Sequence, residues 1–159
     1  MTPLELSLIR LPVEFVIQLT FIIIKTCREI EHATGEIKSL ECELSDLKDD
    51  REELEGHHRY IKWLSIPNSG ICRSIQSLLT EYDGVAESLR RMLTPFLEFF
   101  RVDGSDEEIK FPRRKRFKLV LDKHIGEIAT TTQTVGNEIN RLRIKKISLV
   151  QRVTPYYHP

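Results

Sequence analysis

The chain has 159 residues, a length that favours a single domain. Hydrophobic residues make up 40% of it and charged residues 30%, with 24 basic side chains against 24 acidic ones. This composition excludes a disordered acidic tail, a collagen-like chain and a polytopic membrane protein. Only seven glycines and seven prolines are present, which argues against a turn-rich β-sandwich or barrel. We therefore predict one helical domain over residues 1–159.

The balanced total hides an uneven distribution of charge. Residues 1–55 carry 13 acidic and 6 basic side chains, whereas residues 56–159 carry 11 acidic and 18 basic ones. Blocks of opposite sign either attract each other within one fold or present separate faces to partners. Complementary faces of one helical bundle are the simpler interpretation.

The first predicted element is the apolar run from Leu11 to Ile24, with Pro12 at a position that suits the first turn of a helix. The run lacks period-2 alternation and leads without a turn signal into a helical pattern. We predict one long helix from about Pro12 to Glu55, bent near Gly35. As a helix the apolar run rises only about 21 Å, short of the roughly 30 Å of a bilayer core, so a conventional transmembrane span is not expected.

The second half of this predicted helix carries a heptad seam with one polar interruption, at Arg51. The apolar residues of the seam are Ile30, Ala33, Ile37, Leu40, Leu44, Leu47 and Leu54. An amphipathic helix within a bundle explains this pattern. A free-standing dimeric coiled coil is the alternative.

Breaks and turns divide the rest of the chain. Residues 56–58, Gly-His-His, predict a break in the first helix, and residues 67–70, Pro-Asn-Ser-Gly, form the strongest turn signal. A helix follows over residues 71–93, and Pro95 ends or kinks it.

The last helix is predicted over residues 117–153 and is closed by Pro155, with residues 154–159 as a frayed tail. The inward positions of the two later helices are Ile71, Ile75, Leu78, Leu79, Tyr82, Val85, Ala86, Leu89, Leu93, Leu121, Ile125, Ile128, Thr132, Val135, Ile139, Leu142 and Leu149. These elements predict an all-α fold, an antiparallel bundle of about four to five helices, several of them long.

The apolar run is hydrophobic nearly all round. Its residues with helical spacing, predicted to line the core, are Val13, Val16, Ile17, Phe21 and Ile24. The apolar residues on its other faces are Phe15, Leu19, Ile22 and Ile23. A helix of this kind is normally buried centrally. The alternative is that these four side chains form a releasable surface for a membrane or a partner.

A basic stretch precedes the last helix. Its cations are Lys110, Arg113, Arg114, Lys115, Arg116 and Lys118. Such a stretch binds anionic lipid or nucleic-acid phosphates, serves as a nuclear localisation signal, or is a solvated loop. Of these partners, an anionic membrane is the favoured one and nucleic acid the less favoured.

The sequence offers no recognisable catalytic equipment. Its glycines form no phosphate-binding loop, and no nucleophile, base and orienting group can be named together. Adjacent His57 and His58 would point about 100° apart on a helix. His124 and Glu127 lack the second copy that a di-metal bundle site needs. We predict no enzymatic activity, no metal and no cofactor.

Three cysteines, Cys27, Cys42 and Cys72, show no metal-type spacing. Their odd number and the absence of a recognisable secretory signal indicate a reduced compartment. We expect a cytoplasmic protein, with membrane association on activation left open.

Several segments together resemble a known family. They are residues 16–20 followed by Ile24-Lys25, the leucine-patterned stretch 39–55, Trp63 ahead of the Pro-Asn-Ser-Gly turn, the helix from Ile75 to Leu93, and the basic-aromatic stretch 113–117. In their order and spacing, over about residues 11–150, they resemble the N-terminal domain of fungal STAND proteins. These are NLR-like receptors, and the domain is related to the HeLo-like group.

The resemblance implies a helical bundle without catalytic residues that serves as an effector or signalling domain in fungal non-self recognition and programmed cell death. It implies self-association, engagement of an anionic membrane through the apolar N-terminal segment, and a downstream nucleotide-binding module in a full-length receptor. The chain is then a detached module or a piece of such a receptor. The alternative function is a coiled-coil structural adaptor that recruits a partner helix.

Overall fold

Four long helices form the fold. The structure is a computed structural model that describes residues 12–30, 34–64, 69–100 and 114–157. Its elements are α2 (Val13–Glu29), α3 (Gly35–Trp63), α4 (Ser69–Leu93), the 3-10 helix η1 (Thr94–Phe99), α5 (Arg114–Val153) and the 3-10 helix η3 (Thr154–Tyr156). The described residues contain no strand, and the predicted all-α bundle is confirmed.

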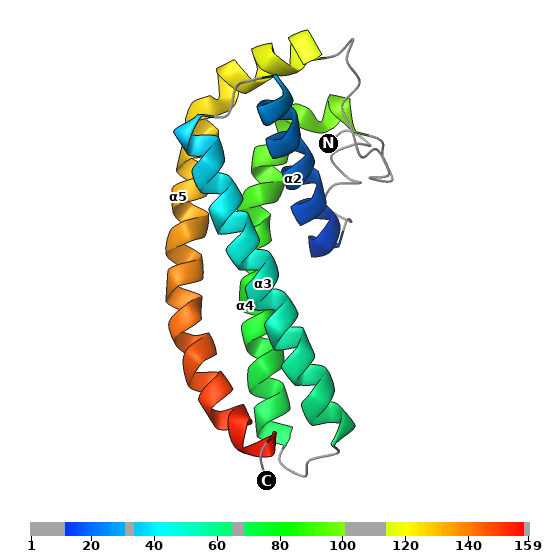
Figure 1. The fold of residues 1–159 in the computed structure, drawn as a ribbon, viewed down its shortest axis with the longest axis vertical. Helices are drawn as coiled ribbons and strands as arrows, with labels where there is room; N and C mark the ends of the chain where they lie inside the picture. The colour runs from blue at the N-terminus through cyan, green and yellow to red at the C-terminus, as the bar shows by residue number, and fades with distance from the viewer. Residues whose placement is uncertain (1–11, 31–33, 65–68, 101–113, 158–159) are drawn as a thin grey trace.

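Successive helices run in opposite directions (Figure 1). The helices α3 and α4 pack against each other, α5 packs on both of them, and α2 also packs on both. Figure 1 shows that α2 covers only one half of the length of this assembly. The first part of α5, drawn in yellow, crosses the end of the bundle before the helix turns to run beside α3. The result is a frame of α3, α4 and α5 with α2 added along one half.

The prediction of a single helix from Pro12 to Glu55 is wrong. Helix α2 ends at Glu29, and α3 begins at Gly35 and runs back along α2 (Figure 1). Thr34 caps the new helix, because its hydroxyl oxygen accepts a hydrogen bond from the backbone N–H of Ile37 at 3.4 Å. A threonine N-cap satisfies a backbone donor that a helix start leaves open. Folding back also lets the apolar surface of α2 be buried against α3 and α4.

The break predicted at residues 56–58 is also wrong, since α3 continues to Trp63. Leu54 before this stretch and Ile61 after it are both buried, so the core-facing stripe of the helix passes straight through. An interior glycine costs about 1 kcal/mol relative to alanine. Burial of these side chains offsets that cost.

The predicted core positions are largely confirmed. In α3 the buried seam residues are Ile37, Leu40, Leu44, Leu47 and Leu54. In α4 and α5 every predicted inward residue is buried except Leu79 and Ile125, which are half-buried. Pro95 stands where α4 gives way to η1, as predicted.

The C-terminal tail packs instead of fraying. The ring of Tyr157 stacks on Tyr60 with a centroid separation of 4.1 Å, and its hydroxyl lies 2.6 Å from Nδ1 of His57. The Tyr60 hydroxyl donates to the backbone oxygen of Tyr156 at 3.3 Å. These contacts tie the chain after α5 to the last turns of α3. Residues 158 and 159 lie outside the described part.

Glycines inside the helices provide a test of the helix assignments. Gly84 is exposed in α4, and a Cβ there would meet nothing within 4 Å. We expect Gly84→Ala to raise the free energy of unfolding by about 1 kcal/mol, measured by urea denaturation. Gly136→Ala is the comparison, because its Cβ would lie 2.9 Å from Oε1 of Glu43 and force that side chain to move. A loss of stability in Gly84→Ala would contradict the assignment of this residue to a helix interior.

Candidate functional site

Two buried charged residues, Asp50 and Arg51, lie side by side in the middle of α3. Asp50 is 2% exposed and Arg51 is 7% exposed. Neighbouring residues of a helix point about 100° apart. Each of the two therefore faces a different set of helices and organises its own group of ion pairs.

Asp50 joins α3 to α4 and α5. Its carboxylate accepts hydrogen bonds from the Tyr82 hydroxyl at 2.9 Å, from Nε of Arg143 at 3.0 Å and from Nζ of Lys146 at 2.9 Å. Desolvation by burial opposes ionisation of this carboxyl. The hydrogen bonds from Arg143, Lys146 and Tyr82 outweigh that effect, so the pKa of Asp50 lies below its ordinary value. The carboxylate is the charged centre of the three-helix frame.

Arg51 joins α3 to α4 and α2. Its Nε donates to Asp83 of α4 at 2.8 Å, and its Nη2 lies 3.2 Å from Glu55 and 3.4 Å from Glu14 of α2. Arg51 is the residue that interrupts the apolar seam. The interruption is thus a buried cation with three carboxylate partners, as a buried charge requires.

Ion pairs between helices explain the uneven distribution of charge along the sequence. Arg143 and Lys146 of α5 reach across to α3, where they pair with Asp46 at 3.1 Å and with Glu53 at 2.7 Å, respectively. Arg114 at the start of α5 pairs with Glu29 of α2 at 2.6 Å. These contacts support the interpretation of the two halves as complementary faces of one bundle.

Three of the four candidate membrane or partner residues of α2 are buried in this fold. Leu19, Ile22 and Ile23 are 2%, 6% and 0% exposed, whereas Phe15 is 40% exposed. Central burial, the first of the two alternatives, therefore describes α2 as it is folded here. Of the residues predicted to line the core, Val16, Ile17 and Ile24 are buried, and Val13 and Phe21 are half-buried.

The structure describes only part of the basic stretch. Lys110 and Arg113 lie outside the described residues. Arg114 pairs with Glu29, and Nε of Arg116 donates to Glu98 of η1 at 2.7 Å. Lys115 and Lys118 are exposed in the first turns of α5. Two of the guanidinium groups are therefore engaged within the molecule, and the two lysines face solvent.

The aromatic residue within the basic stretch is part of the core. Phe117 is fully buried, with ring centroids 5.5 Å from Phe96 and 5.3 Å from Phe99 of η1. Helix α5 begins at Arg114, three residues before the predicted start, so this part of the basic stretch is helical and not a solvated loop. Lys115 and Lys118 therefore project from a helix that the buried side chain of Phe117 anchors to the core.

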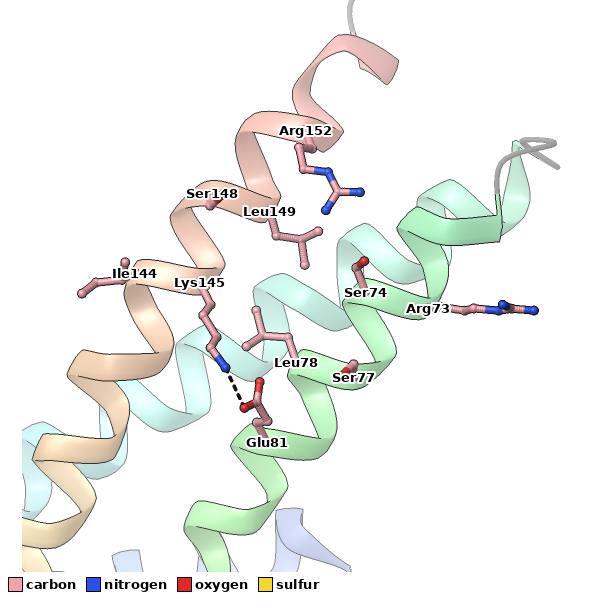
Figure 2. Close-up of a pocket in the computed structure, with 10 residues that line it drawn as sticks. All are labelled: Arg73, Ser74, Ser77, Leu78, Glu81, Ile144, Lys145, Ser148, Leu149 and Arg152. Atoms are coloured by element: carbon pink, nitrogen blue, oxygen red, sulfur yellow. Dashed lines mark hydrogen bonds and ion pairs between the residues drawn. The ribbon is translucent and has the colours of Figure 1, made fainter.

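A groove of about 640 Å³ runs between α4 and α5 (Figure 2). Leu78 and Leu149 face each other at its floor, and Lys145 crosses it to Glu81, with a distance of 2.9 Å between Nζ and Oε1. Arg152 points into the groove, as Figure 2 shows. On the outer side of α5, Ile144 is 73% exposed and Ile147 is 57% exposed. In Figure 2 the side chain of Ile144 points away from α4, and that of Arg73 points away from α5.

A second hollow, of about 390 Å³, lies between α2 and α3. Ile17 and Phe21 of α2 provide its apolar lining. Its charged lining consists of Glu14, Lys48, Arg51, Glu52 and Glu55. Arg51 is paired with Glu14 and Glu55 of this lining and with Asp83, so the hollow carries charges of both signs.

Histidine, cysteine and acidic side chains are the groups that bear on metal and nucleophilic chemistry. No cluster of three His, Cys, Asp or Glu side chains that could hold a metal ion occurs there. His124 Nδ1 lies 3.3 Å from its neighbour Glu127, and His57 contacts Tyr157. Burial raises the pKa of the Cys27 thiol to about 12, so this thiol is protonated and a poor nucleophile at neutral pH.

No family model, curated protein or solved structure matches this chain. Among the described residues, no helix combines the length and the apolar character needed to cross a bilayer.

The Asp50 cluster leads to a prediction about stability. Asp50→Asn leaves the positive charges of Arg143 and Lys146 without their shared carboxylate, so we expect a loss of roughly 3 kcal/mol in the free energy of unfolding. Urea denaturation followed by circular dichroism measures this loss. Asp49→Asn, at the exposed neighbouring position, is the control and should stay within about 0.5 kcal/mol of wild type. Equal stabilities of the two variants would contradict the role given to Asp50.

The same carboxylate makes stability depend on pH. Its pKa is lower in the folded chain than in the unfolded one, so it stabilises the fold above the unfolded pKa of about 3.9. This contribution is lost as the pH falls through the lower, folded pKa. We expect the difference in stability between wild type and Asp50→Asn to shrink as the pH is lowered below about 4. A difference that is constant from neutral to acidic pH would show that Asp50 does not titrate as described.

Proposed function

We propose that this chain is a non-enzymatic effector or signalling domain of an NLR-like protein, as its resemblance to the fungal STAND N-terminal domain implies. In this proposal it acts by self-association and engages anionic membranes on activation. The observation that carries the proposal is the position of α2, an apolar helix that lies along only one half of a frame built by three other helices (Figure 1). Helix α2 is therefore the helix that we expect to separate from the rest of the bundle on activation.

The frame has its own means of holding together. The Asp50 cluster connects α3, α4 and α5 without any residue of α2. Helix α2 is attached by burial of its apolar side chains and by ion pairs at its two ends. Glu14 pairs with Arg51 at one end, and at the other Arg28 pairs with Glu41 and Glu29 with Arg114. Release of α2 would expose Leu19, Ile22 and Ile23 while the polar centre of the frame stays intact. Those three apolar side chains would then be available to a bilayer.

A second candidate function is an adaptor that recruits a partner helix. The groove between α4 and α5 favours it, because Leu78 and Leu149 give the groove an apolar floor. A helix that lays its apolar face in a groove is a recurring mode of recognition.

Sizing by light scattering with and without anionic liposomes separates the two functions. The effector proposal predicts oligomers whose formation depends on the membrane or on protein concentration. A dimer that is insensitive both to salt and to liposomes would favour the adaptor. A chain that remains monomeric under every condition would overturn self-association.

The exposed lysines at the start of α5 provide a specific prediction for lipid binding. Each lysine near an anionic surface contributes about 1 kcal/mol. Replacing Lys115 and Lys118 together by Gln should therefore weaken binding to phosphatidylserine vesicles by about 30-fold in a sedimentation assay. The control replaces Lys38 and Lys62, which are exposed on α3, by Gln. Equal binding by the two double variants would assign lipid affinity to another surface.

A further inference from the structure

One seam of residues runs through both α2 and α3. Its members follow the alternating three- and four-residue spacing of a heptad pattern. They are Val16, Leu19, Ile23, Thr26, Ile30, Ala33, Ile37, Leu40, Leu44 and Leu47. All the members that lie within α2 and α3 are buried. The pattern does not change phase at residues 30–34, where the chain passes from α2 to α3, so the sequence is also suited to one continuous helix.

The sequence between α2 and α3 contains few signals that would stop a helix. No proline lies between Pro12 and Pro67, and the glycine nearest to the reversal is Gly35, the first residue of α3. The cap of α3 is the hydrogen bond from the Ile37 N–H to the Thr34 hydroxyl oxygen, which is long at 3.4 Å. A helix joined by a short link of this kind is one that two copies of a chain can exchange.

The contacts between α2 and α3 have the register that such an exchange needs. Glu14 of α2 pairs with Arg51, and Arg28 of α2 pairs with Glu41. The positions midway in sequence between the members of these two pairs both fall within residues 32–35. When two identical long helices pack antiparallel, residues at equal distances from their two-fold axis meet. An axis through the link between α2 and α3 would therefore bring the same side chains together between two copies.

We propose that two copies of this chain exchange α2. In the exchanged dimer α2 and α3 continue as one helix, and α2 of each copy packs on the frame of the other, in the place that its own α2 occupies in Figure 1. This inference rests on the self-association proposed above and names the segment that is exchanged. The two contacts are equivalent, so the assembly closes as a dimer.

The structure shows what fills the vacated place on the frame, because α2 is the segment that fills it within one chain. Leu19, Ile22 and Ile23 are buried there, and release of α2 into water would expose them. Packing on a second frame buries the same side chains again. A dimer and two monomers thus share these contacts and differ at the link and in the entropy of association. The fraction of dimer should accordingly rise with protein concentration.

The frame tolerates the departure of α2 during the exchange. Arg51 loses Glu14 but retains Asp83 at 2.8 Å and Glu55 at 3.2 Å. Its buried guanidinium is therefore not left as an unpaired charge, which would be strongly destabilising. The Asp50 cluster contains no residue of α2 and stays complete. The frame can consequently hold its form until a second α2 packs on it.

A substitution at Gly35 separates the two arrangements. Proline suits the first residue of a helix and requires an extended residue before it. Thr34 has φ −70° and ψ 171°, and a Cβ at Gly35 would meet nothing within 4 Å, so Gly35→Pro fits the monomer. In the interior of a continuous helix the same proline removes a hydrogen bond and clashes with the preceding turn. Gly35→Ala is the matched control, because both arrangements accept alanine.

Each protein is refolded from urea at low and at high concentration and sized by light scattering. Wild type and Gly35→Ala should be monomeric at low concentration and form dimer at high concentration. Gly35→Pro should weaken dimerisation at least about a hundredfold, with a thermal stability at or above that of wild type. Equal dimerisation by the two variants would overturn the exchange and leave self-association in place. A wild type that stays monomeric in solution also overturns the exchange, and one that stays monomeric on liposomes as well overturns the proposed function itself.

A reversal of charge detects the exchanged contact directly. Arg28→Glu and Glu41→Arg each place like charges at the contact between α2 and α3, both in the monomer and in a dimer of identical copies. In a one-to-one mixture of the two variants, only exchange of α2 between unlike copies pairs opposite charges at both contacts. The heterodimer, counted by native mass spectrometry after joint refolding, should therefore be about tenfold tighter than either homodimer.

The control mixture combines Lys38→Glu with Asp49→Lys. These positions are exposed on α3 and pair with no described residue of α2. Their mixture should distribute at random among the three possible dimers. Adding Gly35→Pro to both members of the test mixture should abolish its heterodimer. A test mixture that distributes at random, like the control, would overturn the exchange of α2.

Discussion

The fold depends on satisfying one buried carboxylate, that of Asp50. Removing an ion from water costs several kcal/mol unless partners replace the lost hydration. The partners come from two other helices, the hydroxyl of Tyr82 on α4 and the cations of Arg143 and Lys146 on α5. Apolar side chains tolerate sliding of one helix past another, whereas these directional bonds form in one register only. We infer that Asp50 fixes the relative rotation and height of α3, α4 and α5.

This constraint divides the molecule into a frame and an added helix. Arg51 turns away from Asp50 and holds Asp83 of the frame together with Glu14 of α2, so one buried cation serves both parts. Two further ion pairs, Arg28 with Glu41 and Glu29 with Arg114, complete the attachment of α2 together with apolar burial, which has no preferred direction. The arrangement gives the frame a specific polar centre, the Asp50 cluster, to which α2 contributes no residue. The proposed effector function uses that difference.

Much of the fold is predictable from the sequence because its signals are local. The seam of Leu40, Leu44 and Leu47 and the helix end at Pro95 appear in the structure as predicted. The hairpin between α2 and α3 was missed because Thr34 is a weak isolated cap signal within a continuous helical pattern. The role of Asp50 cannot be predicted in this way, because its partners are 32, 93 and 96 residues away in the chain, where no local pattern connects them. The burial of Ile23 likewise depends on the chain reversal between α2 and α3. The hydrophobic periodicity of α2 does not predict that reversal.

The central claim is that the Asp50 carboxylate is ionised and stabilised by its donors within the folded bundle. Its pKa can be measured directly by a nuclear magnetic resonance titration that follows the side-chain carboxyl carbon of Asp50 in the native protein. We predict a pKa clearly below the value of about 3.9 found in unfolded chains. A pKa at or above that value would contradict the account, because burial would then outweigh the hydrogen bonds from Tyr82, Arg143 and Lys146.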